Sequence, residues 1–268
     1  MGNRIGFIGA GNMGTAIMRG LVAAEMVTPQ DITAVDVDET QLEKVAADPG
    51  VNIASDLETL AGASDAIVVA VKPQSMADLL RDLAPHVRPS HLMISIAAGI
   101  STGFIEERLG GEVRVVRVMP NTPAMVGTGA TALCSGARAT DADMEFVMRL
   151  FSAVGTAVVF DEEQMHAVTA LSASGPAYFF YLVEKLTKAA VEQGLSAEEA
   201  GALACQTFYG AAKLLRETGA APGDLRARVT SKGGTTQAAL AVFDAEHFEN
   251  IVSQAVSAAV ARSKELGK

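Results

Sequence analysis

The ten residues IGFIGAGNMG, Ile5 to Gly14, decide the fold of the first half of the chain. An apolar run ends in glycines with the spacing G-x-G-x-x-G, and a helical pattern follows at once. This order of strand, glycine-rich turn and helix is typical of a dinucleotide-binding unit. The first glycine allows the tight turn, the second lets a pyrophosphate approach the backbone, and the third allows the helix to pack closely on the strand. The predicted cofactor-binding residues of this loop are Gly9, Gly11, Asn12, Met13 and Gly14.

An acidic residue at the end of the second predicted strand supports this interpretation. Asp36 follows the last glycine by about 20 residues, the position at which a carboxylate accepts hydrogen bonds from the adenosine ribose. Val37 comes next, where an NADP-binding protein normally supplies a cation. Asp38 and Glu39 are better explained as caps of the following helix. A glycine-rich turn that binds no ligand is therefore the weaker alternative, and NADH is favoured over NADPH.

Alternating strands and helices extend this unit into a larger domain. The predicted strands are mostly continuous apolar runs, as expected for parallel strands that are covered on both faces. They span residues 4–8, 32–36, 66–71, 92–97 and 113–118, and two later runs, 131–134 and 157–160, can extend the sheet. The pattern predicts an α/β fold in which residues 1–162 form a Rossmann-like, doubly wound sheet.

The rest of the chain has a helical pattern. Polar residues between 184 and 192 recur at helical spacing opposite an apolar side. Ser196 and Glu199 have the spacing of a capping box for the next helix, which is predicted to run towards Gly219. A last helix is predicted from 247 to 266. Residues 163–268 are therefore predicted to form an all-α C-terminal domain.

Composition and charge exclude several classes of protein. The net charge of −10 and the pI near 4.9 argue against nucleic acid or an acidic membrane as a partner. No apolar run approaches the length that spans a bilayer, and the N-terminus enters a strand pattern too early for a signal peptide. Cys134 and Cys205 lie far apart without CxxC spacing, so neither a metal site nor a disulfide is predicted. These features favour a cytoplasmic protein.

Three short segments lie where predicted strands end, at the sheet edge where α/β proteins bind ligands. They are VKPQ (71–74), SIAAGI (95–100) and RVMPNTPA (117–124). The lysine of the first can hold a cofactor phosphate or ribose, or can lie in solvent. The small residues of the second leave room for a nicotinamide ring, and the asparagine of the third can donate to a carboxamide. The predicted cofactor contacts are Val71, Lys72, Pro73, Ala97, Ala98, Gly99 and Asn121.

The stretch VTSKGGTTQAAL, residues 229–240, interrupts the helical half of the chain. Its two glycines break a helix, and one of the threonines that follow can act as the N-cap of a new one. An ordinary turn between helices is one interpretation. The other is a nest of free backbone N–H groups, flanked by hydroxyls, that binds a carboxylate or a phosphate. The candidate donors are Ser231, Gly233, Gly234, Thr235 and Thr236.

Over almost its entire length the chain resembles the pyrroline-5-carboxylate reductase family. The motifs that carry the resemblance are GFIGAGNMG, VKPQ, SIAAGI, RVMPNTPA, LSASGPAY (171–178) and VTSKGGTTQAAL. The last two are the most specific, because other dinucleotide-binding reductases lack them. Ala173 stands where glycine is common and Lys232 where proline is common. The end of the second strand also departs from relatives that carry small polar residues or an arginine there.

The resemblance implies an NAD(P)H-dependent oxidoreductase. Hydride passes from the reduced nicotinamide to the imine carbon of 1-pyrroline-5-carboxylate and gives L-proline, the last step of proline biosynthesis. The segment with two glycines and two threonines is then the cradle for the substrate carboxylate. In the family the LSASGPAY segment faces the substrate, which adds Ser174 as a substrate contact. Alternatively, Ser174 only caps a helix that begins near Pro176.

The same resemblance suggests a catalytic hydroxyl. Thr169 matches a threonine placed near the imine nitrogen, and it is the candidate for proton delivery, although a water can serve instead. His166 lies nearby in the sequence. A single histidine at the start of a helix is more often a surface or capping residue than a base.

Two other functions are compatible with the fold. A β-hydroxyacid dehydrogenase has the same domain order, but its family uses a lysine in a G-x-x-x-K-x-x-N arrangement that this sequence lacks. A non-catalytic NAD(H)-binding regulatory protein does not need a second anion cradle.

The helices after residue 165 carry more small and apolar residues than one short domain can bury, which predicts a homodimer. The resemblance implies interleaved helical domains and an active site that includes helices of the partner. It also implies that larger rings of dimers occur.

Overall fold

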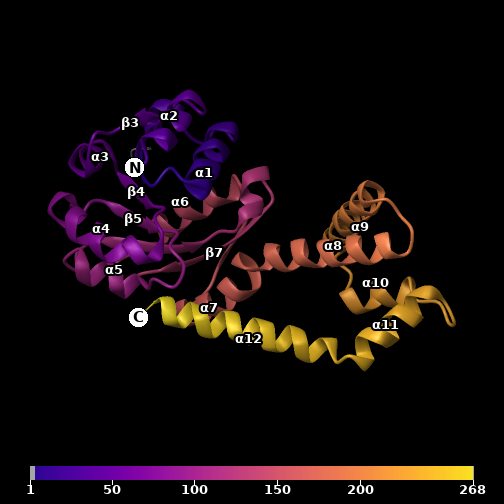
Figure 1. The fold of residues 1–268 in the computed structure, drawn as a ribbon. Helices are drawn as coiled ribbons and strands as arrows, with labels where there is room; N and C mark the ends of the chain where they lie inside the picture. Colours follow the sequence, from indigo (N-terminus) through magenta and orange to yellow (C-terminus); the bar gives the residue numbers. More distant parts are fainter. Residues whose placement is uncertain (1–3, 268) are drawn as a thin grey trace. The chain divides into compact units, whose positions relative to one another are not determined.

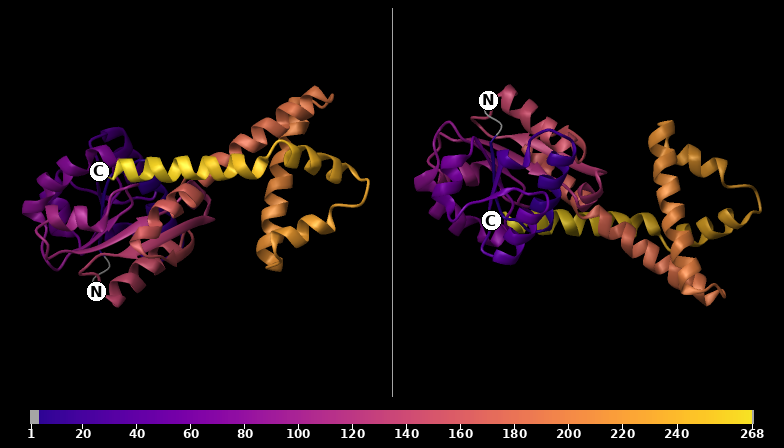
Figure 2. Two further views of the ribbon diagram at one scale, coloured as in Figure 1. Left: turned by 90° about the horizontal axis from the view of Figure 1, so that it is seen from below. Right: turned by 90° about the horizontal axis from the view of Figure 1, so that it is seen from above.

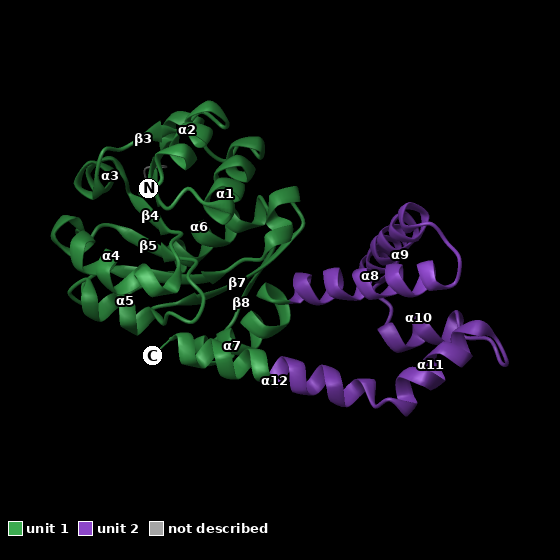
Figure 3. Ribbon diagram, viewed as in Figure 1, with its two compact units in different colours: residues 1–174, 258–268 green, residues 175–257 purple. Residues whose placement is uncertain are grey.

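The computed structural model describes residues 4–267 and divides them into two compact units (Figure 3). Unit 1 contains the chain up to Ser174 together with its C-terminal segment from Ala258, and unit 2 contains Gly175–Ser257. The predicted boundary at residues 162 and 163 therefore differs from this division. The reason is that Met165 is completely buried in a small apolar cluster with Met119 and Cys134 of unit 1.

An eight-stranded sheet forms the centre of unit 1 (Figures 1 and 2). Its strand order is β3-β2-β1-β4-β5-β6-β7-β8, and all neighbours are parallel except β6 and β7. The order changes direction at β1, so the carboxyl ends of β1 and β4 border the crevice where such sheets bind ligands. The predicted doubly wound fold is confirmed. The strands are β1 (Ile5–Ile8), β2 (Ile32–Val35), β3 (Asn52–Ile53), β4 (Ala66–Val69), β5 (Leu92–Ser95), β6 (Arg114–Met119), β7 (Gly129–Ser135) and β8 (Gly155–Val159).

Helices cover the sheet with two apolar layers. Successive strand residues point to opposite faces, so Phe7 packs in the layer that contains α1 and α6, and Ile8 packs in the layer that contains α3, α4 and α5. Both layers consist of completely or almost completely buried side chains. The helices of unit 1 are α1 (Asn12–Ala23), α2 (Glu39–Ala47), α3 (Leu57–Ala63), α4 (Met76–Leu83), α5 (Thr102–Arg108), α6 (Asp141–Ser152) and α7 (Met165–Val168).

Unit 2 is built of helices alone. The capping box is confirmed, because Ser196 and Glu199 exchange hydrogen bonds at the start of α9, and Gly219 ends this helix in the left-handed conformation (φ 61°). Helices α8 and α9 pack together, with the rings of Phe179 and Phe208 edge to face at 6.2 Å. None of the described helices is long and apolar enough to cross a bilayer. The helices are α8 (Gly175–Glu192), α9 (Ala197–Thr218), α10 (Pro222–Arg228), α11 (Thr235–Ala245) and α12 (Phe248–Leu266), whose last turns belong to unit 1.

The predicted helix start near Pro176 is confirmed, since α8 begins at Gly175, but the predicted cap is wrong. Ser174 does not cap a helix, because its backbone has helical angles (φ −82°, ψ −24°), whereas an N-cap residue is extended. A π-helical turn, Thr169–Ala173, follows α7 directly, and the N–H of Ser174 donates to the carbonyl oxygen of Thr169 at 3.0 Å. Helix α8 begins at the next residue, Gly175, directly after this π turn and Ser174.

Candidate functional site

The glycine loop has the shape that a dinucleotide requires. A Cβ atom on Gly9 would lie 2.6 Å from the carbonyl oxygen of Ala70, and one on Gly14 would lie 2.3 Å from that of Gly9. A Cβ atom on Gly11 would meet nothing within 4 Å. Two glycines thus serve close packing, and the third leaves open space at the N-terminus of α1, where N–H groups favour an anion. Asn12 is exposed and Met13 is half-buried in the first turn of that helix.

The carboxylate of Asp36, the residue after strand β2, holds the glycine loop by a hydrogen bond. Its Oδ2 accepts a hydrogen bond from the N–H of Ala10 at 2.6 Å, and its Oδ1 accepts one from the N–H of Asp38 at 3.0 Å. Thr15 holds the loop from the other side through its hydroxyl, which donates to the carbonyl oxygen of Ala10 at 2.8 Å. Val37 is fully exposed beside the carboxylate. The expected capping role of Asp38 is confirmed, since its side chain accepts from the N–H of Thr40, whereas Glu39 is the first residue of α2.

The two segments after β4 and β5 lie at the same edge of the sheet as the glycine loop. Val71 and Pro73 are half-buried, and Lys72 is exposed. Ala97 is buried and Ala98 is half-buried. Gly99 has a positive φ of 82°, and a Cβ atom there would lie 3.0 Å from Leu266 and Ser263. The sequence suggested that Gly99 makes room for a nicotinamide ring, but the last turns of α12 lie against its α-carbon.

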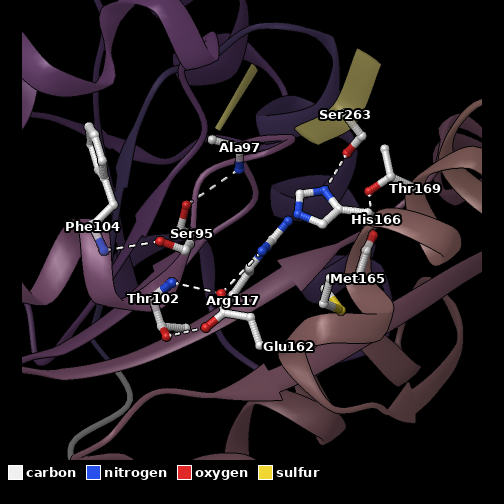
Figure 4. Close-up of polar contacts among 11 residues, drawn as sticks. Ser95, Ala97, Thr102, Phe104, Arg117, Glu162, Met165, His166, Thr169 and Ser263 are labelled. Carbon is white, nitrogen blue, oxygen red and sulfur yellow. Dashed lines mark hydrogen bonds and ion pairs between the residues drawn. The ribbon is translucent and has the colours of Figure 1, made fainter. Parts of the chain in front are cut away.

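Asn121 and Thr169 are both buried, and both use their polar atoms inside unit 1. The Nδ2 of Asn121 donates to the carbonyl oxygen of Ser172 at 3.1 Å, and its Oδ1 accepts from the N–H of Ala130 at 2.9 Å. The hydroxyl of Thr169 donates to the carbonyl oxygen of Met165 at 2.7 Å, as Figure 4 shows. This hydroxyl proton is therefore engaged, and the free lone pairs of the oxygen can accept a hydrogen bond.

A charged cluster joins Arg117 of strand β6, Glu162 and Thr102 at the start of α5 (Figure 4). Arg117 is 1% exposed, and its Nη1 donates to Glu162 Oε1 at 3.1 Å. Glu162 also accepts from the N–H of Thr102 at 2.8 Å and from its hydroxyl at 2.6 Å. The Nε and Nη2 of Arg117 have no hydrogen-bond partner among the described residues. The cluster ties strand β6 to the starts of α5 and of the α7 segment.

Two titratable groups next to this cluster are unsuited to nucleophilic or acid chemistry. Burial raises the pKa of the Cys134 thiol to about 12, and the charge of Glu162 adds to the effect. Burial also lowers the pKa of His166, helped by the charge of Arg117. His166 is half-buried, with its Nδ1 3.0 Å from the Ser263 hydroxyl, so it is neither a surface nor a capping residue. Among the described residues, no group of three acidic, histidine or cysteine side chains is arranged to hold a metal ion.

The predicted anion cradle lies in unit 2, at the start of α11. Gly234 is the N-cap of this helix, not Thr235 or Thr236. The N–H of Gly234 donates to the carbonyl oxygen of Ser231 at 3.1 Å, and the N–H of Gly233, at φ 75°, donates to Gln237 Oε1 at 2.6 Å. Both glycine amides are thus used within the turn. The donors left for an anion are the first-turn N–H groups from Thr235 onward, with the hydroxyls of Ser231, Thr235 and Thr236 nearby in the sequence.

The sequence interpretation missed three of these residues. Arg117 stands between valines in strand β6, and a charge at such an interior strand position is a signal that could have been used. Its partner Glu162 lies 45 residues later in the sequence, and no pattern in the neighbouring residues marks it as the partner. Gln237 lies one turn after Gly233, a spacing that is common in any helix start. The predicted substrate residues also divide between the units, with Thr169 and Ser174 in unit 1 and the cradle in unit 2.

Comparison with known proteins agrees with this architecture. Residues 4–99 match a family described as "NADP oxidoreductase coenzyme F420-dependent", and residues 162–266 match "Pyrroline-5-carboxylate reductase dimerisation". The chain is 45% identical to pyrroline-5-carboxylate reductase of Pseudomonas aeruginosa, covering 99% of this chain and 97% of the relative. It is 43% identical to that of Methanosarcina acetivorans, covering 99% and 98%. The structure of Plasmodium falciparum pyrroline carboxylate reductase with NADP bound superimposes with a TM-score of 0.90 at 32% identity, covering 99% and 98%.

The sheet, the open glycine loop and the helical unit define a nicotinamide-dependent oxidoreductase with a C-terminal dimerisation domain. The identity extends over the whole chain at a level that shows common descent of both units. The chain belongs to the pyrroline-5-carboxylate reductase family, and the resemblance seen in its motifs is confirmed.

Proposed function

We propose that this protein reduces 1-pyrroline-5-carboxylate to L-proline with NAD(P)H. The observation that carries the proposal is the second anion-ready helix start, at α11, in a chain of this family. A protein that only bound a dinucleotide would need the glycine loop at α1 but not this cradle. The substrate is a small ring with one carboxylate and one imine, and two such sites match its cofactor and its carboxylate.

The glycine loop holds the dinucleotide in this proposal. The open space at Gly11 receives the pyrophosphate, and the N–H groups at the start of α1 donate to it. The hydrogen bonds of Asp36 and Thr15 to Ala10 keep the loop in the required shape before the cofactor arrives. The bound nicotinamide supplies the hydride. The remaining proposed contacts, in the segments at Lys72 and Ala97, border the same sheet edge.

We further propose that NADH serves at least as well as NADPH. The carboxylate of Asp36 is held by two backbone N–H groups and cannot easily turn away from the ribose side of the loop. An additional phosphate within about 5 Å would be repelled by roughly 3 kcal/mol at an effective dielectric constant near 20. Val37 offers no compensating charge.

The substrate side uses hydroxyls and amides rather than a strong acid. In the proposed site the first-turn N–H groups of α11 and the hydroxyls of Ser231, Thr235 and Thr236 hold the carboxylate. An imine that is already protonated is activated for hydride attack, so orientation contributes most of the rate. Thr169 already donates its proton to Met165, and it therefore accepts a hydrogen bond from the protonated imine nitrogen instead of delivering the proton. The proton enters with the substrate or through a water.

Unit 2 also supplies the proposed homodimer contact. Its exposed large apolar side chains include Phe180, Leu203 and Ile251, which expose 67%, 60% and 56% of their surface. A match to a dimerisation domain covers this part of the chain. Pairing of these helices around a two-fold axis would bury the exposed surface. A larger ring of dimers and a cytoplasmic location remain predictions from the sequence.

The decisive experiment is a turnover assay on the purified protein. NADH or NADPH is mixed with 1-pyrroline-5-carboxylate, and loss of the reduced cofactor is followed together with formation of proline. The parallel assay contains NAD and 3-hydroxyisobutyrate. Proline formation in the first assay alone supports the proposal. Turnover only in the second, or binding of NADH without turnover in either, contradicts it.

A further inference from the structure

Pro176 lies in the first turn of α8 and cannot donate a hydrogen bond to the carbonyl oxygen of Ser172, four residues earlier. In an α-helix the carbonyl oxygen of Ser172 would accept a hydrogen bond from the N–H of the residue four positions later, and proline has no N–H. A proline ring also crowds the carbonyl group four positions before it. The residues just before it, Thr169–Ala173, form a π-helical turn, which is wider than an α-helical turn. Such turns are rare and are frequent at functional sites.

The side-chain amide of Asn121 supplies a donor to this carbonyl oxygen. Its Nδ2 donates to the Ser172 carbonyl oxygen at 3.1 Å, and its Oδ1 accepts from the N–H of Ala130 at 2.9 Å. The hydroxyl of Ser172 donates to the carbonyl oxygen of Ala130 at 3.3 Å. These three bonds form a closed ring that joins the strand-end loop after β6, strand β7 and the π turn. All three segments belong to unit 1.

Because Asn121 is buried, these hydrogen bonds require an amide side chain at position 121. The side chain is 8% exposed, so a group without the right donor and acceptor would be left unsatisfied away from water. Only an amide presents a donor on one branch and an acceptor on the other at this length. Both branches point at backbone groups of the protein, although the sequence suggested a contact to the nicotinamide carboxamide.

We infer that Asn121 is a positioning residue for the substrate side of the site: it fixes the π turn that carries Thr169 and Ser172. The inference rests on the proposed function, because it assigns the Thr169 oxygen to the imine nitrogen. Thr169 is the first residue of the turn and Ser172 its fourth, so a shift at Ser172 changes the direction of the Thr169 hydroxyl. The cofactor loop at Gly11 is held by separate bonds and is not affected.

The test uses Asn121→Asp, which keeps an acceptor for Ala130 and replaces the donor to Ser172 by a second oxygen. The kcat/KM for 1-pyrroline-5-carboxylate is expected to fall by about tenfold or more, the equivalent of one lost hydrogen bond and one repulsive contact. The dissociation constant of NADH, measured by its fluorescence, is expected to stay within about twofold. Asn52→Asp is the matched control, because Asn52 Nδ2 also donates to a backbone carbonyl, that of Gln30 at 2.7 Å, on the edge strand β3.

A second measurement does not depend on activity. Pro176→Ala restores an N–H that can donate to the Ser172 carbonyl oxygen. Asn121→Asp should therefore lower the Tm less in the Pro176→Ala background than in the wild type, a non-additivity expected only for groups that share a partner. This coupling keeps the inference testable even if the wild type fails to reduce 1-pyrroline-5-carboxylate, a result that would refute the proposed function alone.

Three results would overturn the inference. An increase of the NADH dissociation constant by Asn121→Asp, with the substrate KM unchanged, would place Asn121 against the cofactor. A fall in kcat/KM that Asn52→Asp reproduces would show a general effect of the substitution. Equal losses of Tm in both backgrounds at position 176 would show that the amide does not replace the missing N–H.

Discussion

In unit 1 the side chains of Phe7, Leu21 and Phe151 are completely buried, whereas in unit 2 those of Phe180, Leu203 and Ile251 expose more than half of their surface. The sheet of unit 1 is covered on both faces by its own helices, so its apolar side chains are satisfied within one chain. Helices of unit 2 have apolar residues over more of their circumference than one neighbour can cover. The first unit carries its own core, and the second leaves large apolar side chains exposed in the single chain, which is why we propose a partner for it.

The two proposed binding sites differ in the same way as the two units that carry them. The glycine loop of unit 1 rests on a buried scaffold and is fixed by bonds to Asp36 and Thr15. The cradle of unit 2 is a turn with exposed residues, held by local bonds between Gly233 and Gln237 and between Gly234 and Ser231. We therefore expect cofactor binding to survive changes that abolish substrate binding and turnover.

The largest effect is expected from a charge in unit 2. Ala211→Glu places a carboxylate on the face of α9 that also carries Leu203 and Leu214, both exposed in the single chain. Burying an unpaired charge in a helix pair is strongly unfavourable, so we expect a monomer by light scattering and loss of turnover. NADH binding to unit 1 should persist. Ala46→Glu, on an exposed position of α2, is the matched control. A wild type that is a stable, active monomer at micromolar concentration contradicts the predicted dimer.

The glycines of unit 1 give the next largest effect. Gly11→Ala adds a methyl group where the protein has open space, so the Tm should stay constant while the NADH dissociation constant rises by about tenfold or more. Gly14→Ala forces a methyl group against the Gly9 carbonyl oxygen and should lower stability by about 1–3 kcal/mol. Gly62→Ala, also in open space, is the control. Unchanged NADH affinity in Gly11→Ala would show that the pyrophosphate does not approach this glycine.

Removal of a hydroxyl from the cradle should act on the substrate alone. Thr236→Ala and Ser231→Ala are each expected to raise the KM for 1-pyrroline-5-carboxylate by about tenfold, since a hydrogen bond to a charged group contributes roughly 1.5–3 kcal/mol. The KM for NADH is measured in the same assays and should change little. Thr230→Ala is the control, because the Thr230 hydroxyl donates to the carbonyl oxygen of Arg226 within unit 2. If both cradle variants retain the wild-type substrate KM, the carboxylate binds elsewhere.

The smallest effect concerns the choice of cofactor. Asp36→Ser removes a negative charge and should lower the KM for NADPH by about fivefold, less than the unscreened repulsion implies because salt weakens it. The KM for NADH should rise slightly, because a ribose acceptor and the bond to Ala10 are lost together. Competition of NADPH against NADH at two salt concentrations measures the electrostatic part. A strong preference of the wild type for NADPH that this variant leaves unchanged would show that Asp36 faces away from the ribose.

Local patterns were sufficient where neighbouring residues decide the structure. The glycine spacing and the apolar strands predicted the doubly wound sheet, and the capping box of Ser196 and Glu199 predicted the start of α9. The helix start near Pro176 was predicted correctly but its cap was not, because a serine before a proline is a good cap candidate by its sequence, whatever backbone angles the preceding turn gives it. The N-cap at Gly234 was missed for a similar reason, since threonines next to a glycine are equally good candidates for that position.

The amino-acid sequence by itself determined the fold class, the family and the cofactor loop, because these depend on periodicity and on glycines a few residues apart. Only the tertiary structure decided what the polar side chains do. In the folded chain, Asn121 forms hydrogen bonds with Ser172 and Ala130. Arg117 forms an ion pair with Glu162, and the end of α12 packs against Gly99. Each of these contacts joins residues distant in the chain, and a buried polar group must find whichever partner the packed fold brings within hydrogen-bond reach.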